Sequence, residues 1–189
     1  MEKTRNFEED LKNSNNPTLR KAWEKIFRLK FGEDCEIDWK DSKIIQKELG
    51  TDITIKTRKG RRYSVELKTR KKCYEPELYI MEIISHIYDQ ELEPRTYLHS
   101  KEGWIYTTTA EYIFHATIEN NQIIDCIFYS LIPFKLEKYK SEFNNYKNFW
   151  LPTLFSNGTF QLTLNKLIPK EIIKRDSLEF WEWKYGIKN

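Results

Sequence analysis

The chain has 189 residues, of which 39% are hydrophobic and 15% aromatic, and this length is typical of a single domain that buries one core. The composition excludes disorder for most of the chain, and the 6 glycines and 6 prolines exclude a collagen-like or linker-rich sequence. The formal net charge of +3 neither requires nor excludes a nucleic-acid partner, because its meaning depends on where the charges lie.

The sequence favours a soluble, cytoplasmic protein. Its first ten residues are charged from the second position onward and hold no apolar run, which is not typical of a signal or transit peptide. No window approaches the roughly 18 consecutive apolar residues that a membrane span needs. The three cysteines, Cys35, Cys73 and Cys126, are odd in number and far apart, so they fit neither a disulfide framework nor a zinc site. We therefore expect reduced thiols and no membrane contact.

The N-terminal half begins with one helix and continues mainly as strands. A cap at Asn16 and a stop at Gly32 enclose apolar residues at helical spacing, which predicts a helix between them. A polar connection follows, and then a short strand over Lys43–Leu49. Two segments of alternating polarity, Thr51–Thr57 and Arg61–Thr69, predict a β-hairpin.

The remaining chain predicts further strands and two helices. The strands are Leu78–Tyr88, Glu111–Ile118, Ile123–Leu131 and Thr159–Leu164. One helix is predicted from Pro133 to about Lys147 and another over Lys170–Trp183. A helix followed by several strands and further helices predicts an α/β (α+β) fold with a partly antiparallel sheet. Since no internal repeat or linker divides the chain, we expect residues 1–189 to form one domain.

The loop of the hairpin determines which residues oppose one another. The segment Arg58–Gly60 fits a three-residue loop that ends in a glycine of positive φ. This register places Asp52 opposite Glu66. It also gathers the apolar side chains on one face: Ile53, Ile55, Tyr63, Val65 and Leu67. A two-residue loop would shift the register by one residue and mix the two faces, so the apolar pattern favours the three-residue loop.

The other face of the hairpin carries Asp52, Glu66 and Lys68, which is a pattern suited to a metal ion. Opposed residues have Cβ atoms about 4.5–5.5 Å apart, and two carboxylates at that distance repel each other unless a cation or a proton lies between them. Mg²⁺ binds one or two carboxylates and completes its coordination with water and substrate phosphate, and Mn²⁺ is a substitute. Lys68 would orient the attacking water and stabilise charge on the phosphate. The alternative is a surface cluster in which Lys68 only neutralises the carboxylates.

The hairpin carries a short pattern, Gly50-Thr51-Asp52 followed after a turn by Val65-Glu66-Leu67-Lys68. This pattern resembles the PD-(D/E)XK nuclease superfamily, and the resemblance extends over Leu19–His115, about half of the chain. It implies a restriction-endonuclease-like core, in which a helix, a three-stranded meander, a helix and another strand form a central mixed sheet flanked by helices. The segment Tyr79–Tyr88 departs from this core, because it is strand-like where the family often has a helix.

The resemblance also implies roles for individual residues. Asp52 and Glu66 would bind the catalytic magnesium, Leu67 would add its backbone carbonyl, and Lys68 would activate water. Many superfamily members add an acid from the first helix, and Glu24 is the corresponding residue here. The alternative for Glu24 is a surface charge ladder with arginines four residues to either side.

Positive charge is concentrated around the hairpin. Residues 56–72 hold nine basic side chains and one acidic one, so the rest of the chain is mildly acidic. The sequence predicts that nucleic-acid phosphates bind to Arg58, Lys59, Arg61, Arg62, Arg70, Lys71 and Lys72. The alternative is a solvated hairpin tip. The aromatic segment Phe180–Tyr185 would stack on bases or, as we favour, pack in the core.

These features together predict a Mg²⁺-dependent DNA endonuclease that hydrolyses phosphodiester bonds with metal-activated water. We place its catalytic core at about residues 17–118 and a C-terminal extension at about 119–189. The alternative is a non-catalytic DNA-binding module, or a subunit of a larger DNA-processing assembly, that retains the nuclease fold. The residues do not distinguish RNA from DNA, and symmetrical cutting of both strands of a duplex would require a homodimer.

Overall fold

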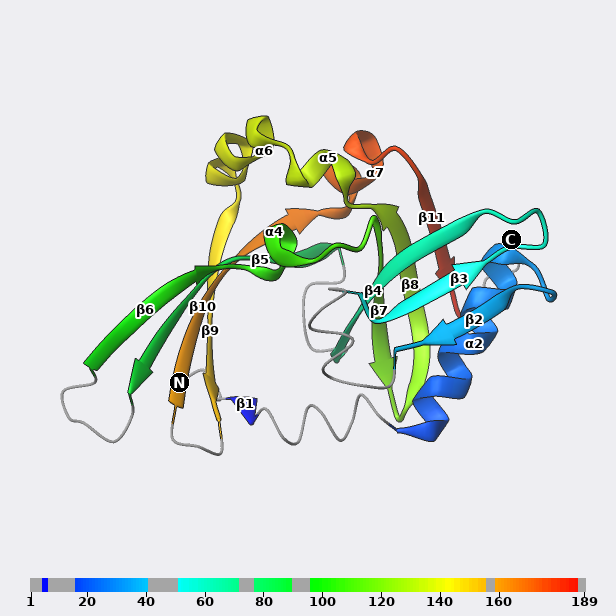
Figure 1. Cartoon of the computed structure of the whole chain (residues 1–189), viewed down its shortest axis with the longest axis horizontal. Helices are drawn as coiled ribbons and strands as arrows, with labels where there is room; N and C mark the ends of the chain where they lie inside the picture. The colour runs from blue at the N-terminus through cyan, green and yellow to red at the C-terminus, as the bar shows by residue number, and fades with distance from the viewer. Residues whose placement is uncertain are drawn as a thin grey trace.

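The structure is a computed structural model that describes residues 5–6, 16–40, 51–71, 77–89, 96–155 and 159–186. The described residues form a mixed α+β fold with a six-stranded and a five-stranded sheet, which occupy the two halves of the molecule (Figure 1). The strand predicted over Lys43–Leu49 lies outside the described residues, as do Lys72 and Cys73. No helix in the described part of the chain is long and apolar enough to cross a membrane.

Helix α2 (Pro17–Phe31) confirms the helix predicted between Asn16 and Gly32. The Asn16 side chain accepts a hydrogen bond from the backbone N–H of Thr18 at 2.9 Å, which caps the first turn. Gly32 ends the helix with φ of +99°, a conformation that favours glycine. The helix buries Leu19, Trp23, Ile26 and Phe27 against one face of the six-stranded sheet, and this contact forms the first of two cores.

The six-stranded sheet has the order β11-β8-β7-β4-β3-β2. Its strands are β2 (Glu36–Trp39), β3 (Ile53–Lys56), β4 (Arg62–Lys71), β7 (Tyr112–Glu119), β8 (Gln122–Ser130) and β11 (Phe180–Lys184). Strands β2, β3 and β4 form an antiparallel meander, β7 runs parallel to β4, and β8 and β11 continue antiparallel. Strands β8 and β11 come after residue 119, so this one sheet combines strands from both halves of the chain.

The register of the hairpin is confirmed. Ile53 pairs with Val65 and Ile55 with Tyr63. The backbone N–H of Thr57 donates to the carbonyl of Arg61 at 2.9 Å, and Gly60 has φ of +81°. These features show the predicted three-residue loop. The predicted apolar face is buried against α2, so the alternate side chains of β4, including those of Glu66 and Lys68, project from the opposite face.

The five-stranded sheet has the order β1-β9-β10-β5-β6. Its strands are β1 (Arg5–Asn6), β9 (Lys147–Leu154), β10 (Thr159–Pro169), β5 (Leu78–Asp89) and β6 (Thr96–Glu102). Strands β5 and β6 and the short helix α4 (Trp104–Thr107) lie in the chain between the parallel strands β4 and β7. The crossover between those two strands therefore contains part of a second sheet.

Three short helices lie together at one end of the two sheets (Figure 1). They are α5 (Ile132–Lys135), α6 (Glu137–Glu142) and α7 (Lys170–Asp176), and a 3₁₀ turn, η1 (Phe143–Asn145), follows α6. The single helix predicted from Pro133 to about Lys147 is wrong, because Leu136 is extended with ψ of 146° and β9 begins at Lys147. The break lets Phe134, Tyr139 and Phe143 enter the second core together.

The helix predicted over Lys170–Trp183 is also wrong in its second half. Helix α7 ends at Asp176, and β11 follows. Trp181 and Trp183 pack against the first core, whereas Glu182 between them is exposed. This alternation has the two-residue period of a strand. Core packing is thus the role of the tryptophans in this segment. Cys35 and Cys126 are free, buried thiols.

We expect Gly103→Ala to lower the free energy of unfolding by roughly 2–3 kcal/mol, because a methyl group at Gly103 would collide with the backbone of Glu82 and Ile83 in β5. Gly60→Asn is the matched control, since Gly60 has a positive φ that asparagine tolerates and open space around it. Urea unfolding measures both. Equal stability of Gly103→Ala and the wild type would contradict the close packing of α4 on β5.

Candidate active site

Three charged residues of the hairpin come together on the face of the sheet opposite α2. Lys68 Nζ donates a hydrogen bond to Glu66 Oε1 at 2.6 Å, and both residues lie on β4. Asp52 precedes β3, and its Oδ2 accepts a hydrogen bond from the backbone N–H of Leu67 at 2.7 Å. Asp52 is therefore tied to the peptide between Glu66 and Lys68. The structure brings together the three residues that the sequence placed on one face.

The backbone before β3 holds Asp52 in this position. The hydroxyl of Thr51 is buried and donates to the carbonyls of Ile53 and Val65, at 3.1 Å and 3.0 Å. The backbone N–H of Asp52 donates to the carbonyl of Val65 at 3.1 Å. The strand ladder ends here, and the Asp52 carboxylate takes the N–H of Leu67 that a longer β3 would have bonded. The side chain of Asp52 is thus fixed by the end of its own strand.

The two carboxylates of the cluster repel each other, and both attract the ammonium group of Lys68. Burial raises the pKa of Asp52 to about 6, and the neighbouring carboxylate of Glu66 adds to this rise, whereas Lys68 and the Leu67 N–H lower it. Burial lowers the pKa of Lys68, but the carboxylates of Glu66 and Asp52 outweigh it and raise the pKa overall. The ammonium group therefore stays charged at neutral pH. With both carboxylates ionised, the three residues carry one net negative charge.

Residues from the second sheet and from α4 surround the cluster. Lys68 Nζ lies 4.9 Å from the centre of the Trp104 ring. Glu82 of β5 is near enough to raise the pKa of Lys68, and its Oε1 accepts a hydrogen bond from Ser85 at 2.7 Å. The cluster thus lies where the six-stranded sheet meets β5 and α4. Trp104 was not predicted, whereas the position of Glu82 as a polar residue within an apolar strand was a signal in the sequence.

The donor set of the cluster fits Mg²⁺. This ion typically takes one or two protein carboxylates and keeps water or phosphate in its other positions. Burial is the larger cause of the raised pKa of Asp52, and electrostatic repulsion by Glu66 adds to it. Within the described residues no group of three His, Cys, Asp or Glu side chains could hold a metal, so water and phosphate would have to supply most ligands. The role of the Leu67 carbonyl stays a prediction.

Glu24 lies apart from this cluster. It is on α2, which packs on the opposite face of the sheet, and its Oε1 accepts a hydrogen bond from Trp39 Nε1 at 3.2 Å. The guanidinium of Arg20 stacks on the same tryptophan at 4.4 Å. The structure does not bring Glu24 together with Asp52 and Glu66 as a third metal ligand.

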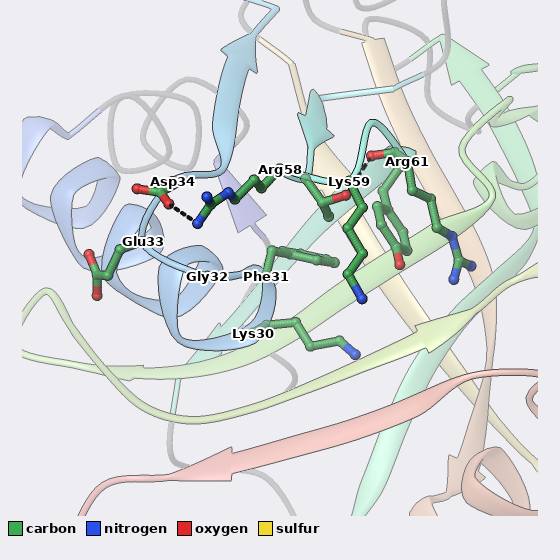
Figure 2. A pocket seen from close by; sticks show the side chains of 10 residues that line it. Lys30, Phe31, Gly32, Glu33, Asp34, Arg58, Lys59 and Arg61 are labelled. Carbon is green, nitrogen blue, oxygen red and sulfur yellow. Dashed lines mark hydrogen bonds and ion pairs between the residues drawn. The ribbon is translucent and has the colours of Figure 1, made fainter.

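Basic residues at the tip of the hairpin line a separate pocket of about 610 Å³ between the end of α2 and the β3–β4 turn. Its cations are Lys30, Arg58, Lys59 and Arg61. In Figure 2 the amines of Lys30 and Lys59 extend beside the ring of Phe31, whereas Glu33 points away from them. Lys30 and Arg61 both form ion pairs with Glu179, at 3.0 Å and 3.1 Å, and Arg58 lies 3.6 Å from Asp34.

The predicted phosphate contacts are therefore not equivalent. Lys59 and Arg62 are exposed and form no ion pair among the described residues. Arg70 is built into the fold, since it donates to Thr117 Oγ1 at 3.0 Å and to the carbonyl of Leu78, and stacks on Tyr79 at 4.4 Å. Lys71 ends β4, and Lys72 lies outside the described residues.

The basic tip also stands away from the carboxylates. Arg61 and Glu66 are five positions apart in the chain, which is roughly 17 Å along an extended strand. The pocket opens beside Tyr63, whose side chain is on the α2 face of the sheet, whereas Glu66 is on the other face. The basic residues that line this pocket therefore lie away from the carboxylate cluster.

Comparison with known proteins identifies no family for this chain. No protein-family model, no curated protein and no solved structure matches it. The geometry of the cluster and the topology of the sheet are therefore the basis for a proposal about function.

We expect Asp52→Asn to stabilise the protein at pH 8, because burial and Glu66 disfavour the ionised carboxylate. The folded-state pKa of about 6 is above the usual value of about 3.9, so wild-type stability falls as the pH rises from about 4 through about 6. The variant lacks this loss, and its advantage is on the order of 3 kcal/mol at pH 8 and near zero below pH 4. Urea unfolding across this pH range measures it.

The matched control for this prediction is Asp38→Asn. Asp38 is also near the start of the meander, but its side chain is 66% exposed and pairs with Lys40. We expect no comparable gain at pH 8 from this variant. An Asp52→Asn advantage that is absent at pH 8, or that grows toward low pH, would contradict the buried repulsion between Asp52 and Glu66.

Proposed function

We propose that this protein is a Mg²⁺-dependent nuclease of the PD-(D/E)XK type that hydrolyses phosphodiester bonds in DNA. The observation that carries the proposal is the convergence of Asp52, Glu66 and Lys68 on one face of the hairpin. Lys68 and Glu66 are joined by a hydrogen bond of 2.6 Å, and Asp52 is fixed between them by the N–H of Leu67. Two carboxylates and an ammonium group in this arrangement suit a phosphate substrate and a divalent cation.

The topology of the six-stranded sheet supports the same proposal. Helix α2 precedes the meander β2-β3-β4, and a crossover that includes α4 leads to β7, which is parallel to β4. This order corresponds to the helix, meander, helix and strand that the resemblance implies. The crossover differs in size, because α4 has only 4 residues and is preceded by β5 and β6.

Each residue of the cluster has a separate task in the proposed reaction. Asp52 and Glu66 would hold the cation. When bound, the cation would act as a Lewis acid and lower the pKa of the water molecule attached to it. The hydrogen bond to Leu67 leaves Oδ1 of Asp52 free to act as a ligand. Lys68 carries its charge at neutral pH and stands beside Glu66, where it stabilises the negative charge that develops on the phosphate.

The exposed cations of the hairpin tip would bind the substrate away from the site of cleavage. Lys59 extends into the pocket beside Phe31, as Figure 2 shows, and Arg62 lies on β4 on the same face as Glu66. Arg58 and Arg61 would contribute after exchanging their carboxylate partners for phosphates. Phosphate contacts of this kind position nucleic acid without reading its sequence.

We expect Asp52→Asn, Glu66→Gln and Lys68→Met each to reduce Mg²⁺-dependent cleavage by about 100-fold or more, because each removes a group that acts on the reacting phosphate or its cation. The substrates are single-stranded, duplex, flap and four-way-junction DNA and single-stranded RNA, with Mg²⁺ or Mn²⁺. Glu36→Gln is the matched control, since Glu36 pairs with Lys56 on the same meander outside the cluster.

The outcomes of this assay separate two functions. Cleavage that depends on all three residues supports the nuclease. Binding of DNA without cleavage by the wild type would favour a non-catalytic module that retains the fold, and the direct hydrogen bond by which Lys68 neutralises Glu66 is the observation consistent with it. Equal cleavage by the wild type and Asp52→Asn would overturn the catalytic assignment.

We expect the double variant Lys59→Ala, Arg62→Ala to bind DNA more weakly at all sequences. Loss of two phosphate contacts should reduce the slope of log K against log salt by roughly 2. Fluorescence anisotropy at several salt concentrations measures this slope, with Asp52→Asn as the background that prevents cleavage. Lys140→Ala is the control, because Lys140 pairs with Glu137 on α6. An unchanged slope would show that the hairpin tip is not part of a nucleic-acid interface.

A further inference from the structure

Lys68 has two partners of different kinds. One is Glu66, whose Oε1 accepts its hydrogen bond at 2.6 Å. The other is the ring of Trp104, whose centre lies 4.9 Å from Nζ. An ammonium group over the face of tryptophan is attracted by the negative charge of the ring face, and tryptophan is the strongest such partner among the aromatic residues. The flexible stem of Lys68 is thus restrained from two sides.

Trp104 is held by elements that do not belong to the hairpin. It is the first residue of α4, and the preceding Gly103 donates its N–H to the carbonyl of Ile83 at 2.8 Å. Gly103 packs so closely on β5 that a side chain there would collide with the backbone. The indole ring is also nearly perpendicular to the ring of His115 on β7, with ring centres 6.4 Å apart.

The other end of α4 is fixed as well. Lys135 Nζ donates to the carbonyls of Thr108 and Ala110, at 2.7 Å and 2.6 Å. The N–H of Thr108 donates a hydrogen bond to the carbonyl of Trp104 at 2.9 Å. The indole ring is therefore carried on a short, anchored segment, and its position over Lys68 does not depend on Glu66.

We propose that Trp104 is a positioning residue that keeps the ammonium group of Lys68 at the reacting phosphate; this inference rests on the proposed nuclease function. Under that function Glu66 is a ligand of the cation, and a carboxylate oxygen engaged in this way is a weaker acceptor for Lys68. Asp52 would likewise be a ligand of the cation. Glu82 of β5 is a further carboxylate near the ammonium group. Trp104 is the partner of Lys68 that the cation does not compete for.

A purely structural role for Trp104 predicts something different. The indole ring is partly buried and packs against the second core, so its loss would then reduce stability and leave Lys68 unaffected. Two variants separate these roles. Trp104→Phe retains an aromatic face, whereas Trp104→Leu retains an apolar side chain without one. Trp150→Leu is the control, because Trp150 is 38% exposed on β9.

The test has one readout on Lys68 itself and one on cleavage. In nuclear magnetic resonance spectra, the ε protons of Lys68, assigned by their loss in Lys68→Arg, should be shifted upfield by the indole ring. We expect this shift to persist in part in Trp104→Phe and to disappear in Trp104→Leu. In the cleavage assay Trp104→Leu should lower kcat about tenfold with KM unchanged within twofold, and Trp104→Phe should stay within threefold of the wild type in kcat.

The two readouts also separate this inference from the function on which it rests. An upfield shift that is lost in Trp104→Leu, together with a wild type that cleaves no substrate, would overturn the nuclease and leave the contact with Lys68 standing. Cleavage by the wild type with an unshifted Lys68, or a wild-type kcat in Trp104→Leu, would overturn the role of Trp104 and leave the nuclease standing.

Discussion

The burial of the Asp52 carboxylate beside the carboxylate of Glu66 is the constraint on which the candidate site depends. Burial and repulsion by Glu66 raise the pKa of Asp52 to about 6, so the folded protein carries an unfavourable charge at neutral pH. Lys68 and the backbone N–H of Leu67 offset it only in part. With both carboxylates ionised, the cluster has a local excess of negative charge, which under the proposed function would bind a divalent cation.

Strand β5 of the second sheet and helix α4 lie beside the site and contribute residues near Lys68. Strand β5 and helix α4 belong to the crossover between β4 and β7. The chain leaves the cluster at the end of β4, and the crossover brings it back beside the same cluster. Glu82 and Trp104 reach Lys68 from this crossover, and Lys135 anchors its far end. The resemblance implies a helix at this point of the fold. Here a 4-residue helix on a strand of another sheet takes that place.

The parts that could be predicted from the sequence are those with local causes. The loop glycine at position 60 and the alternation of apolar residues determine the register of the hairpin, and this register alone brings Asp52 and Glu66 together. The break at Leu136 and the strand β11 could not be predicted, because the second core and the edge of β8 decide them. Trp104 was missed for the same reason, since it reaches Lys68 only through a crossover that spans two sheets.

The separation of the basic tip from the carboxylates follows from the chemistry that the cluster would perform. Lys68 already cancels one of the two negative charges of Asp52 and Glu66, and Lys135 also interacts with Glu66, so further cations there would weaken the proposed binding of Mg²⁺. Phosphates still have to be attracted to the protein. Arg62 and Arg61 of the tip lie roughly 13 Å and 17 Å from Glu66 along the strand direction, beyond the screening length of about 8 Å at physiological ionic strength. Under the proposed function these charges would therefore bind nucleic acid without weakening the binding of the cation.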